Sequence, residues 1–181
     1  MTITEQFRYY RFAIVGASGS GKTTLGQQVG QILNLRVIDL DSLNWEANWT
    51  MAPTAVFRQR VALALQGDAW VVSGNYSRAR DLIWSRADTL VWLDYPLRVV
   101  FWRLFRRTLK RIVTREELFG GNRETLQSQF LSRDSLFLWL LQSQPRHRRE
   151  YPKLLELPEY RHLKLLRFYS PRETKCWLES L

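Results

Sequence analysis

The sequence has little cysteine or histidine and no long apolar run. Its single cysteine, Cys176, excludes an internal disulfide framework. Its two histidines lie far apart and do not have the spacing of metal ligands. The longest purely apolar stretch, Leu136–Leu141, has six residues, whereas a membrane span needs about 20. A signal-peptide pattern is also missing at the N-terminus. We therefore expect a cytoplasmic protein with no transmembrane segment and no zinc or redox chemistry.

The chain also lacks internal boundaries. No linker rich in proline, glycine or serine divides the 181 residues, and no repeat is visible. Apolar residues make up 45% and charged residues 24% of the chain, which is typical of folded proteins and excludes a disordered one. We expect one domain that spans residues 1–181.

Negative charge is scarce, since 17 acidic residues face 27 lysines and arginines. The resulting net charge of +10 predicts a positive potential that attracts polyanions. Three partners fit: nucleotide phosphates, nucleic acid and an anionic membrane surface. The positions of the basic residues must distinguish between these partners.

Short apolar stretches alternate with helical patterns along the chain. Strands are predicted at residues 11–15, 36–40, 69–72, 89–93 and 163–168. Helices are predicted at residues 24–33, 53–66, 79–86, 96–115 and 124–142, and from Pro171, where Ser170 and Glu173 form a capping box. The alternation predicts an α/β fold with three layers, in which helices cover both faces of a five-stranded parallel sheet.

Residues 16–23 read GASGSGKT and match the phosphate-binding pattern GxxxxGK[ST] between a predicted strand and a predicted helix. The glycines let backbone N–H groups turn inward, and the following helix adds its positive N-terminal end. We therefore expect ATP as the cofactor, with Lys22 at the β- and γ-phosphates and Thr23 on Mg²⁺. The predicted nucleotide-binding residues are Gly16, Ala17, Ser18, Gly19, Ser20, Gly21, Lys22, Thr23 and Thr24.

Two carboxylates follow the second predicted strand. Asp39 and Asp41 would project from the same side at the carboxyl edge of the sheet, where α/β folds bind ligands. One of them would support Mg²⁺, and the other would meet the hydroxyl of a phosphate acceptor. The alternative is that Asp41 only caps the next short helix. Asp94, just ahead of Pro96, is predicted to act in local capping or against a helix dipole.

The predicted helix near residues 98–115 carries seven basic residues and no acidic one. Arg103, Arg107 and Arg111 are spaced four apart and share a face. Beside that face we expect an apolar stripe of Leu97, Phe101, Leu104, Phe105 and Ile112. The arginines would serve a transferring phosphate, a nucleic-acid backbone or, with Trp102, a lipid surface. A merely solvated face is the remaining interpretation.

These residues resemble those of small P-loop kinases related to adenylate kinase, and most closely the branch named DNA topology modulation protein. The resemblance implies a nucleoside-monophosphate-kinase-like fold with a helical lid within residues 96–150. Arg103 and Arg107 follow Pro96 at the spacing of the adenylate-kinase helix whose two arginines contact ATP phosphates. The resemblance therefore gives both arginines a catalytic role, which adds them to Lys22 and Asp41 as the predicted catalytic residues.

Further resemblances concern the acceptor. The segment Trp70–Arg78 is similar to the third-strand motif of nucleotide kinases, which implies acceptor-binding roles for Gly74, Asn75 and Arg78. Ser73 stands where adenylate kinases carry an aspartate, so Asp39 would have to compensate. Asp39 and Asp41 resemble the pair of shikimate-kinase-like enzymes, in which one residue supports Mg²⁺ and the next binds the acceptor hydroxyl.

The lid region also resembles the topology-modulation branch, through the sequence GGNRE that starts at Gly120 and Gly121. These glycines are either a hinge for closure or part of an ordinary loop. The basic cluster Arg146, His147, Arg148 and Arg149 is predicted to be solvated.

Taken together, these patterns predict a kinase that uses ATP and Mg²⁺ to phosphorylate a small molecule or a nucleotide. One alternative is an ATP-binding regulatory protein whose basic surface holds nucleic acid. The other is a degenerate kinase fold that serves as an interaction module.

Overall fold

The computed structural model describes residues 10–123 and 135–181. Its central sheet has five strands in the order β2-β3-β1-β4-β7, and all neighbouring strands pair in parallel. These strands are β1 (Arg11–Gly16), β2 (Arg36–Asp39), β3 (Trp70–Ser73), β4 (Thr89–Leu93) and β7 (Lys164–Phe168). All five predicted strands are confirmed, with ends that differ by one residue at most.

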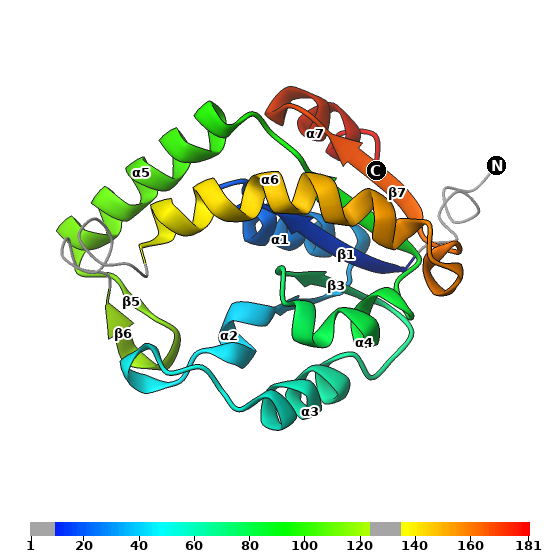
Figure 1. The fold of residues 1–181 in the computed structure, drawn as a ribbon, viewed down its shortest axis with the longest axis horizontal. Coiled ribbons are helices and arrows are strands. Elements are labelled where there is room, and N and C mark those ends of the chain that lie inside the picture. Colours follow the sequence, from blue (N-terminus) through cyan, green and yellow to red (C-terminus); the bar gives the residue numbers. More distant parts are fainter. Residues whose placement is uncertain (1–9, 124–134) are drawn as a thin grey trace.

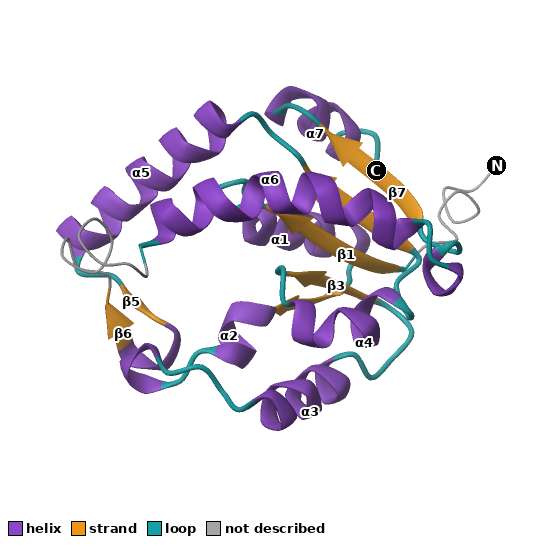
Figure 2. Cartoon of the chain, viewed as in Figure 1, coloured by secondary structure: helices purple, strands orange, loops and turns teal. Residues whose placement is uncertain are grey.

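Helices cover both faces of this sheet (Figures 1 and 2). They are α1 (Lys22–Leu33), α2 (Leu40–Asn44), α3 (Thr54–Ala64), α4 (Arg80–Trp84), α5 (Leu97–Thr114), α6 (Leu136–Leu155) and α7 (Pro171–Leu178). Short elements complete the described part: η2 (Ala47–Trp49), η3 (Ser77–Ala79), η4 (Phe119–Gly121), η6 (Pro158–Tyr160) and the strands β5 (Glu117–Leu118) and β6 (Asn122–Arg123), which pair antiparallel. The predicted three-layer α/β fold is confirmed.

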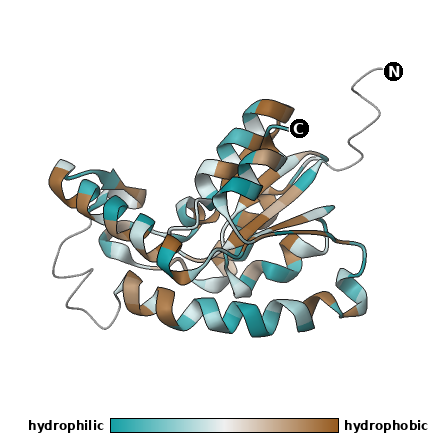
Figure 3. Ribbon diagram, turned by 90° about the horizontal axis from the view of Figure 1, so that it is seen from above, coloured by the Kyte–Doolittle hydropathy of each residue, from teal (hydrophilic) through white to brown (hydrophobic). Residues whose placement is uncertain are grey.

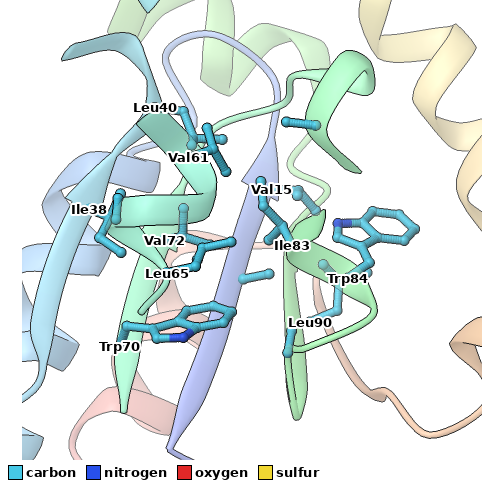
Figure 4. Packing of buried hydrophobic residues seen from close by; sticks show 14 of the residues in the cluster. Val15, Ile38, Leu40, Val61, Leu65, Trp70, Val72, Ile83, Trp84 and Leu90 are labelled. Carbon is cyan, nitrogen blue, oxygen red and sulfur yellow. The ribbon is translucent and has the colours of Figure 1, made fainter. Parts of the chain in front are cut away.

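Side chains of the strands alternate between two cores. One core joins Val15, Val72 and Leu90 to α3, α4 and the end of α6, and Figure 4 shows its packing around Trp70 and Trp84. The other core joins the intervening strand residues to α1, α5, α7 and the start of α6. Because both faces are covered, the strands are apolar along nearly their whole length, which is why short apolar runs predicted them.

Two predicted boundaries were wrong. The second strand ends at Asp39, because the Asp39 side chain accepts a hydrogen bond from the Asp41 N–H and so caps α2. The helix predicted at residues 124–142 continues to Leu155 and passes through Pro145 and Pro152. Burial of its Tyr151 among aromatic rings anchors that extension. Residues 124–134 lie outside the described residues.

The apolar stripe predicted on α5 is also partly wrong. The residues of α5 that are buried in the sheet core are Val100, Leu104 and Thr108, and only Leu104 belongs to the predicted stripe. Leu97 and Phe101 are exposed instead. The helix is thus rotated so that Arg103 and Arg107, each three residues after a buried position, lie beside the core and not opposite it.

No helix in residues 10–123 and 135–181 is long and apolar enough to cross a membrane.

Loss of core packing should be measurable at Leu90, which is fully buried on β4. The substitution Leu90→Ala removes apolar contacts and leaves a cavity, so we expect it to lower the free energy of unfolding by about 2–5 kcal/mol. Urea denaturation followed by circular dichroism measures this change. Leu63→Ala is the matched control, because Leu63 on α3 is 54% exposed; an equal loss in both variants would contradict the proposed core.

Candidate active site

The phosphate loop lies between β1 and α1, as predicted, and packs tightly against α5. A Cβ atom built on Gly19 would lie 2.5 Å from the carbonyl oxygen of Val100, so only glycine fits there. The φ angle of Gly19 is +83°, a conformation that side chains disfavour. Helix α5 therefore forms one wall of the loop, while Thr24 lies exposed in the first turn of α1.

Asn75 holds the first residue of the loop through both its N–H and its carbonyl group. Its side-chain Oδ1 accepts a hydrogen bond of 3.1 Å from the Gly16 N–H, and its Nδ2 donates one of 2.5 Å to the Gly16 carbonyl. Both polar groups of the Asn75 amide are thereby directed at the loop. The structure places this residue, which the resemblance assigned to the acceptor, in contact with the nucleotide side of the site.

Lys22 is enclosed by the loop and by charged neighbours. Its Nζ donates a hydrogen bond of 3.2 Å to the Ala17 carbonyl. Burial is the main cause that lowers the pKa of Lys22 to about 8; the charge of Arg107 also lowers it, and the carboxylates of Asp41 and Asp39 oppose the shift. An anion bound in the loop would restore the proton on this amine.

Two of the three arginines in the α5 row face the loop. The Nη1 of Arg103 donates to the Ser20 carbonyl over 3.4 Å, and its guanidinium lies 5.6 Å from the ring centre of Tyr95. Arg107 lies near enough to Lys22 to influence its charge. Arg111 pairs instead with Glu116 at 3.5 Å. The structure thus places the arginines chosen by resemblance, Arg103 and Arg107, at the loop and separates Arg111 from them.

Thr23 and Asp39 come together as a candidate magnesium site. The Thr23 hydroxyl donates to Asp39 Oδ2 over 3.2 Å, and Asp39 Oδ1 caps α2. Burial, followed by the neighbouring Asp41, raises the pKa of Asp39, so a cation would stabilise its charged form. The described residues contain no cluster of three or more histidines, cysteines, aspartates or glutamates. A Mg²⁺ ion here would therefore take its remaining ligands from phosphate and water, as Mg²⁺ commonly does.

The alternative in which Asp41 only caps the next helix was wrong, because the capping residue lies two positions earlier. The cap is Asp39, and Asp41 lies in the first turn of α2. Its Oδ1 accepts a hydrogen bond of 2.6 Å from the hydroxyl of Tyr76. In the described part of the chain its Oδ2 makes no hydrogen bond, and the carboxylate is half-buried. One oxygen of Asp41 is thus oriented by the protein and the other is available to an acceptor.

Tyr76 is a residue that the sequence did not single out, although it lies between Asn75 and Arg78. Burial, followed by the charge of Asp41, raises the pKa of its phenol, which therefore stays protonated and donates. Its ring packs against Phe57, with ring centres 5.0 Å apart. No sequence signal pairs Tyr76 with Asp41, because the two residues lie 35 positions apart.

The remaining acceptor candidates have structural contacts. The guanidinium of Arg78 donates to the Ala52 carbonyl over 2.9 Å and to Asn44 Oδ1, and it stacks on Phe57 at 4.3 Å. Gly74 packs against the side chain of Leu40. Ser73 is buried, and its hydroxyl has no hydrogen-bond partner among the described residues. Ser73 is the register partner of Asp39 on the neighbouring strand β2, so the carboxylate of Asp39 lies beside that position.

Asp94 is not a local cap, which corrects the sequence prediction. This carboxylate is buried at the end of β4 and pairs with Arg148 at 2.6 Å and with Arg167 at 2.7 Å. The cap position of α5 is Pro96, which makes no side-chain hydrogen bond. Asp94 therefore ties α6 and β7 to the strand beside the phosphate loop.

The basic cluster at residues 146–149 is not simply solvated, in contrast to the prediction. Arg148 pairs with Asp94, and His147 is buried with its ring stacked on Tyr151 at 4.8 Å. Burial, followed by the charge of Arg146, lowers the pKa of His147 to about 4, and Lys22 contributes to the shift. His147 is therefore neutral at pH 7 on the side of the site formed by α6.

Gly120 and Gly121 lie in the turn between β5 and β6, and this turn packs against residues 46 and 47. A Cβ atom on Gly120 would lie 2.7 Å from the backbone carbon of Glu46, and Asn122 bonds to the Trp49 N–H at 2.8 Å and the Glu46 carbonyl at 2.7 Å. The β5–β6 hairpin thus joins the end of α5 to the segment after α2 (Figure 1). The close contact is a structural reason for glycine at residue 120; Glu124 lies outside the described residues.

With this geometry in view, the chain is similar to known small-molecule kinases. The shikimate kinase family model matches residues 18–63, which is less than half of the chain. A shikimate kinase from Bacteroides thetaiotaomicron is 18% identical with a TM-score of 0.54, and the match covers 94% of each chain. A gluconokinase from Sinorhizobium meliloti is 17% identical with a TM-score of 0.52, over 96% of this chain and 94% of that one.

A third solved structure, shikimate kinase from Acinetobacter baumannii in complex with shikimate, is 15% identical with a TM-score of 0.50, over 96% of this chain and 90% of that one. The search of curated proteins found no match. At these identities the solved structures show the fold. The fold is that of the P-loop kinases, and the matched segment contains Lys22, Thr23, Asp39 and Asp41.

The low pKa of Lys22 makes nucleotide binding dependent on pH. In the free protein Lys22 loses its proton as the pH rises through about 8, whereas bound phosphates would keep it charged. We therefore expect the binding of Mg·ATP to take up a proton above pH 8 and its affinity to fall there. Titration calorimetry at about pH 9 in two buffers of different ionisation enthalpy measures the uptake. Lys110→Gln should leave the uptake unchanged; binding without proton uptake would refute the predicted shift.

Proposed function

We propose that the protein is a kinase that transfers the γ-phosphate of ATP to a hydroxyl group of a small molecule, with Mg²⁺. The arrangement that carries this proposal is the meeting of Thr23, Asp39 and Asp41 beside the phosphate loop. A nucleotide-binding protein without phosphotransfer would need the loop and Thr23 but not a second, oriented carboxylate. Support also comes from the shikimate kinase family model, whose match includes all three residues.

The chain's own residues fit ATP and Mg²⁺. The loop amides and Lys22 would hold the phosphates, while Arg103 and Arg107 would stabilise the charge of the group in transfer. Thr23 and Asp39 would hold Mg²⁺, which supplies neutralisation of phosphate charge when it is bound. Asp41 would accept the hydroxyl proton of the acceptor as that oxygen attacks the γ-phosphorus and ADP leaves. Gly74 and Arg78 would shape the acceptor side of the site, and Asn75 would hold the phosphate loop beside it.

The acceptor is proposed from the similar structures. Their printed names point to shikimate and to the substrate of a gluconokinase, and both substrates are hydroxylated carboxylic acids. We propose an acceptor of this class, with nucleotides as the second choice that follows from the adenylate-kinase resemblance. The outward-facing nucleic-acid site predicted from the arginine row is disfavoured, because Arg103 contacts the loop.

Three finer parts of the prediction belong to this proposal. One is the relationship to the DNA topology modulation branch, which rests on the sequence GGNRE. Another is a single functional unit of residues 1–181, in which residues 96–150 act as a lid. The third is a cytoplasmic location, which suits an enzyme that uses cellular ATP.

The direct test is ADP release from Mg·ATP in the presence of single candidate acceptors. The panel contains hydroxylated carboxylic acids, including shikimate and gluconate, together with sugars and nucleoside monophosphates. We expect ADP release above the ATPase background with at least one hydroxylated acid, and mass spectrometry should show the added phosphate. ATP binding by the protein, combined with no transfer to any member of the panel, would contradict the proposal.

Asp41→Asn separates transfer from nucleotide binding. The variant keeps the shape of the side chain but removes its ability to accept a proton, so we expect kcat to fall at least about a hundredfold. The affinity for Mg·ATP, measured by calorimetry well below pH 8, where Lys22 keeps its proton, should change little, because Asp41 belongs to the acceptor side. Asp68→Asn is the control, because Asp68 is exposed to solvent and is distant in sequence from the phosphate loop. Normal turnover of Asp41→Asn would disprove the assigned role.

Tyr76→Phe tests how Asp41 is oriented. The variant removes one hydroxyl that donates to Asp41 over 2.6 Å, and a hydrogen bond to a charged group contributes about 1.5–3 kcal/mol. We expect kcat to fall about tenfold or more with the KM for ATP unchanged. Tyr160→Phe, at a buried tyrosine on η6, should have normal kinetics. A rise in the KM for ATP with kcat preserved would mean that Tyr76 acts on the loop and not on Asp41.

A further inference from the structure

Helix α5 has an outer side that the active site does not use. Rows four residues apart place Phe101, Phe105, Leu109 and Val113 side by side, next to a second row of Arg98, Trp102, Arg106 and Lys110. Trp102 is 52% and Val113 is 81% exposed. Bulky apolar side chains on a solvent-facing helix expose surface that water disfavours, so a contiguous group of them suggests a partner.

The start of α6 extends this surface. The ring of Phe137 lies between the two helices, 5.3 Å from the ring centre of Phe101 and 6.5 Å from that of Phe105. Beside it, Leu138, Trp139 and Leu141 are each between 44% and 47% exposed. Figure 3 shows the hydrophobic colouring at the beginning of α6 and the hydrophilic colouring of its middle. We name the exposed apolar residues of both helices the α5–α6 face: Phe101, Trp102, Leu109, Val113, Leu138, Trp139 and Leu141.

Positive charges are interleaved with this face, and two of them contact its aromatic rings. Arg106 lies 5.1 Å from the ring centre of Trp102, and Arg146 lies 5.3 Å from that of Trp139. Arg98, Arg106 and Lys110 have no carboxylate partner within the described residues. Neither α5 nor the segment 135–149 contains an acidic residue. The face is therefore apolar and cationic at once, and the one ion pair among these cations joins Arg146 to Glu150 of α6 at 3.9 Å within the described residues.

We propose that the α5–α6 face binds an anionic lipid surface. Tryptophan, leucine and phenylalanine beside arginine and lysine on a helix are the side chains that insert at the boundary between headgroups and acyl chains. Each basic residue near an anionic bilayer adds to the attraction. The protein would lie on the surface without crossing it, because no described helix is apolar enough to span a bilayer.

The combination of positive charge with exposed apolar side chains favours a lipid surface over nucleic acid. Nucleic acid would engage Arg98, Arg106 and Lys110, but it would leave the aliphatic side chains of Leu109 and Val113 exposed to water. The arginines of the active site, Arg103 and Arg107, lie on the loop side of α5 and are not needed for this contact. Lipid binding and phosphotransfer are therefore separable by mutation.

The test is co-sedimentation of the full chain with vesicles of phosphatidylcholine alone or mixed with phosphatidylglycerol. We expect binding to the mixed vesicles at low salt, weaker binding as salt rises, and little binding to phosphatidylcholine alone. The triple variant Arg98→Gln, Arg106→Gln, Lys110→Gln and the double variant Trp102→Ser, Trp139→Ser should each weaken binding at least about tenfold. Both variants should bind Mg·ATP normally, which shows that they are folded.

Matched controls and contrary outcomes decide the proposal. Leu63→Ser and Arg172→Gln change exposed residues elsewhere and should bind vesicles like the parent. Absence of binding to the anionic vesicles would overturn the proposal. So would salt-sensitive binding to duplex DNA that the triple variant loses while vesicles are not bound. A concentration-dependent dimer that the double variant abolishes, again without vesicle binding, would assign the face to a second copy of the chain.

Discussion

The backbone of Gly16 is held in one orientation by a side chain from the neighbouring strand's end, and the geometry of the site follows from that contact. Asn75 both accepts from and donates to the Gly16 peptide, so the loop cannot turn without breaking two hydrogen bonds. The next residue, Tyr76, donates to Asp41. Two adjacent side chains thus position the phosphate loop and the acceptor carboxylate from one short backbone segment. The distance between the bound nucleotide and the phosphate acceptor would therefore be set by the backbone of residues 75 and 76.

In the free site the charged forms of both a cationic and an anionic side chain are disfavoured. Burial and the neighbouring Arg107 lower the pKa of Lys22, while burial and the neighbouring Asp41 raise the pKa of Asp39. A bound phosphate would favour the charged form of Lys22, and a bound cation would favour that of Asp39. Magnesium and a nucleotide together would stabilise the charged forms of both Lys22 and Asp39. Part of their binding free energy would therefore come from removing unfavourable electrostatics in the free protein. We therefore expect the site to bind the pair more tightly than either component alone.

Local patterns predicted the fold well, because strands buried on both faces are apolar runs and the phosphate loop has a nearly unique spacing. All five central strands and the loop from Gly16 to Thr23 were predicted correctly. Contacts across the sheet were not predictable: Asn75 reaches Gly16 over 59 positions and Arg148 reaches Asp94 over 54. The rotation of α5 was misjudged, because both of its sides carry apolar residues and periodicity alone does not choose between them. The roles of the individual site residues remain predictions.

The pairing of Asp94 with Arg148 and Arg167 has a consequence for how the chain folds during synthesis. The carboxylate directly follows β4, an interior strand of the sheet, yet both of its partners are translated later, from α6 and β7. Until they emerge from the ribosome, closing the sheet around Asp94 would bury an uncompensated charge at a cost of several kcal/mol. The first half of the chain should thus stay open on that side, with Asp94 in contact with water. Final closure of the nucleotide-binding edge would come only with the last strand.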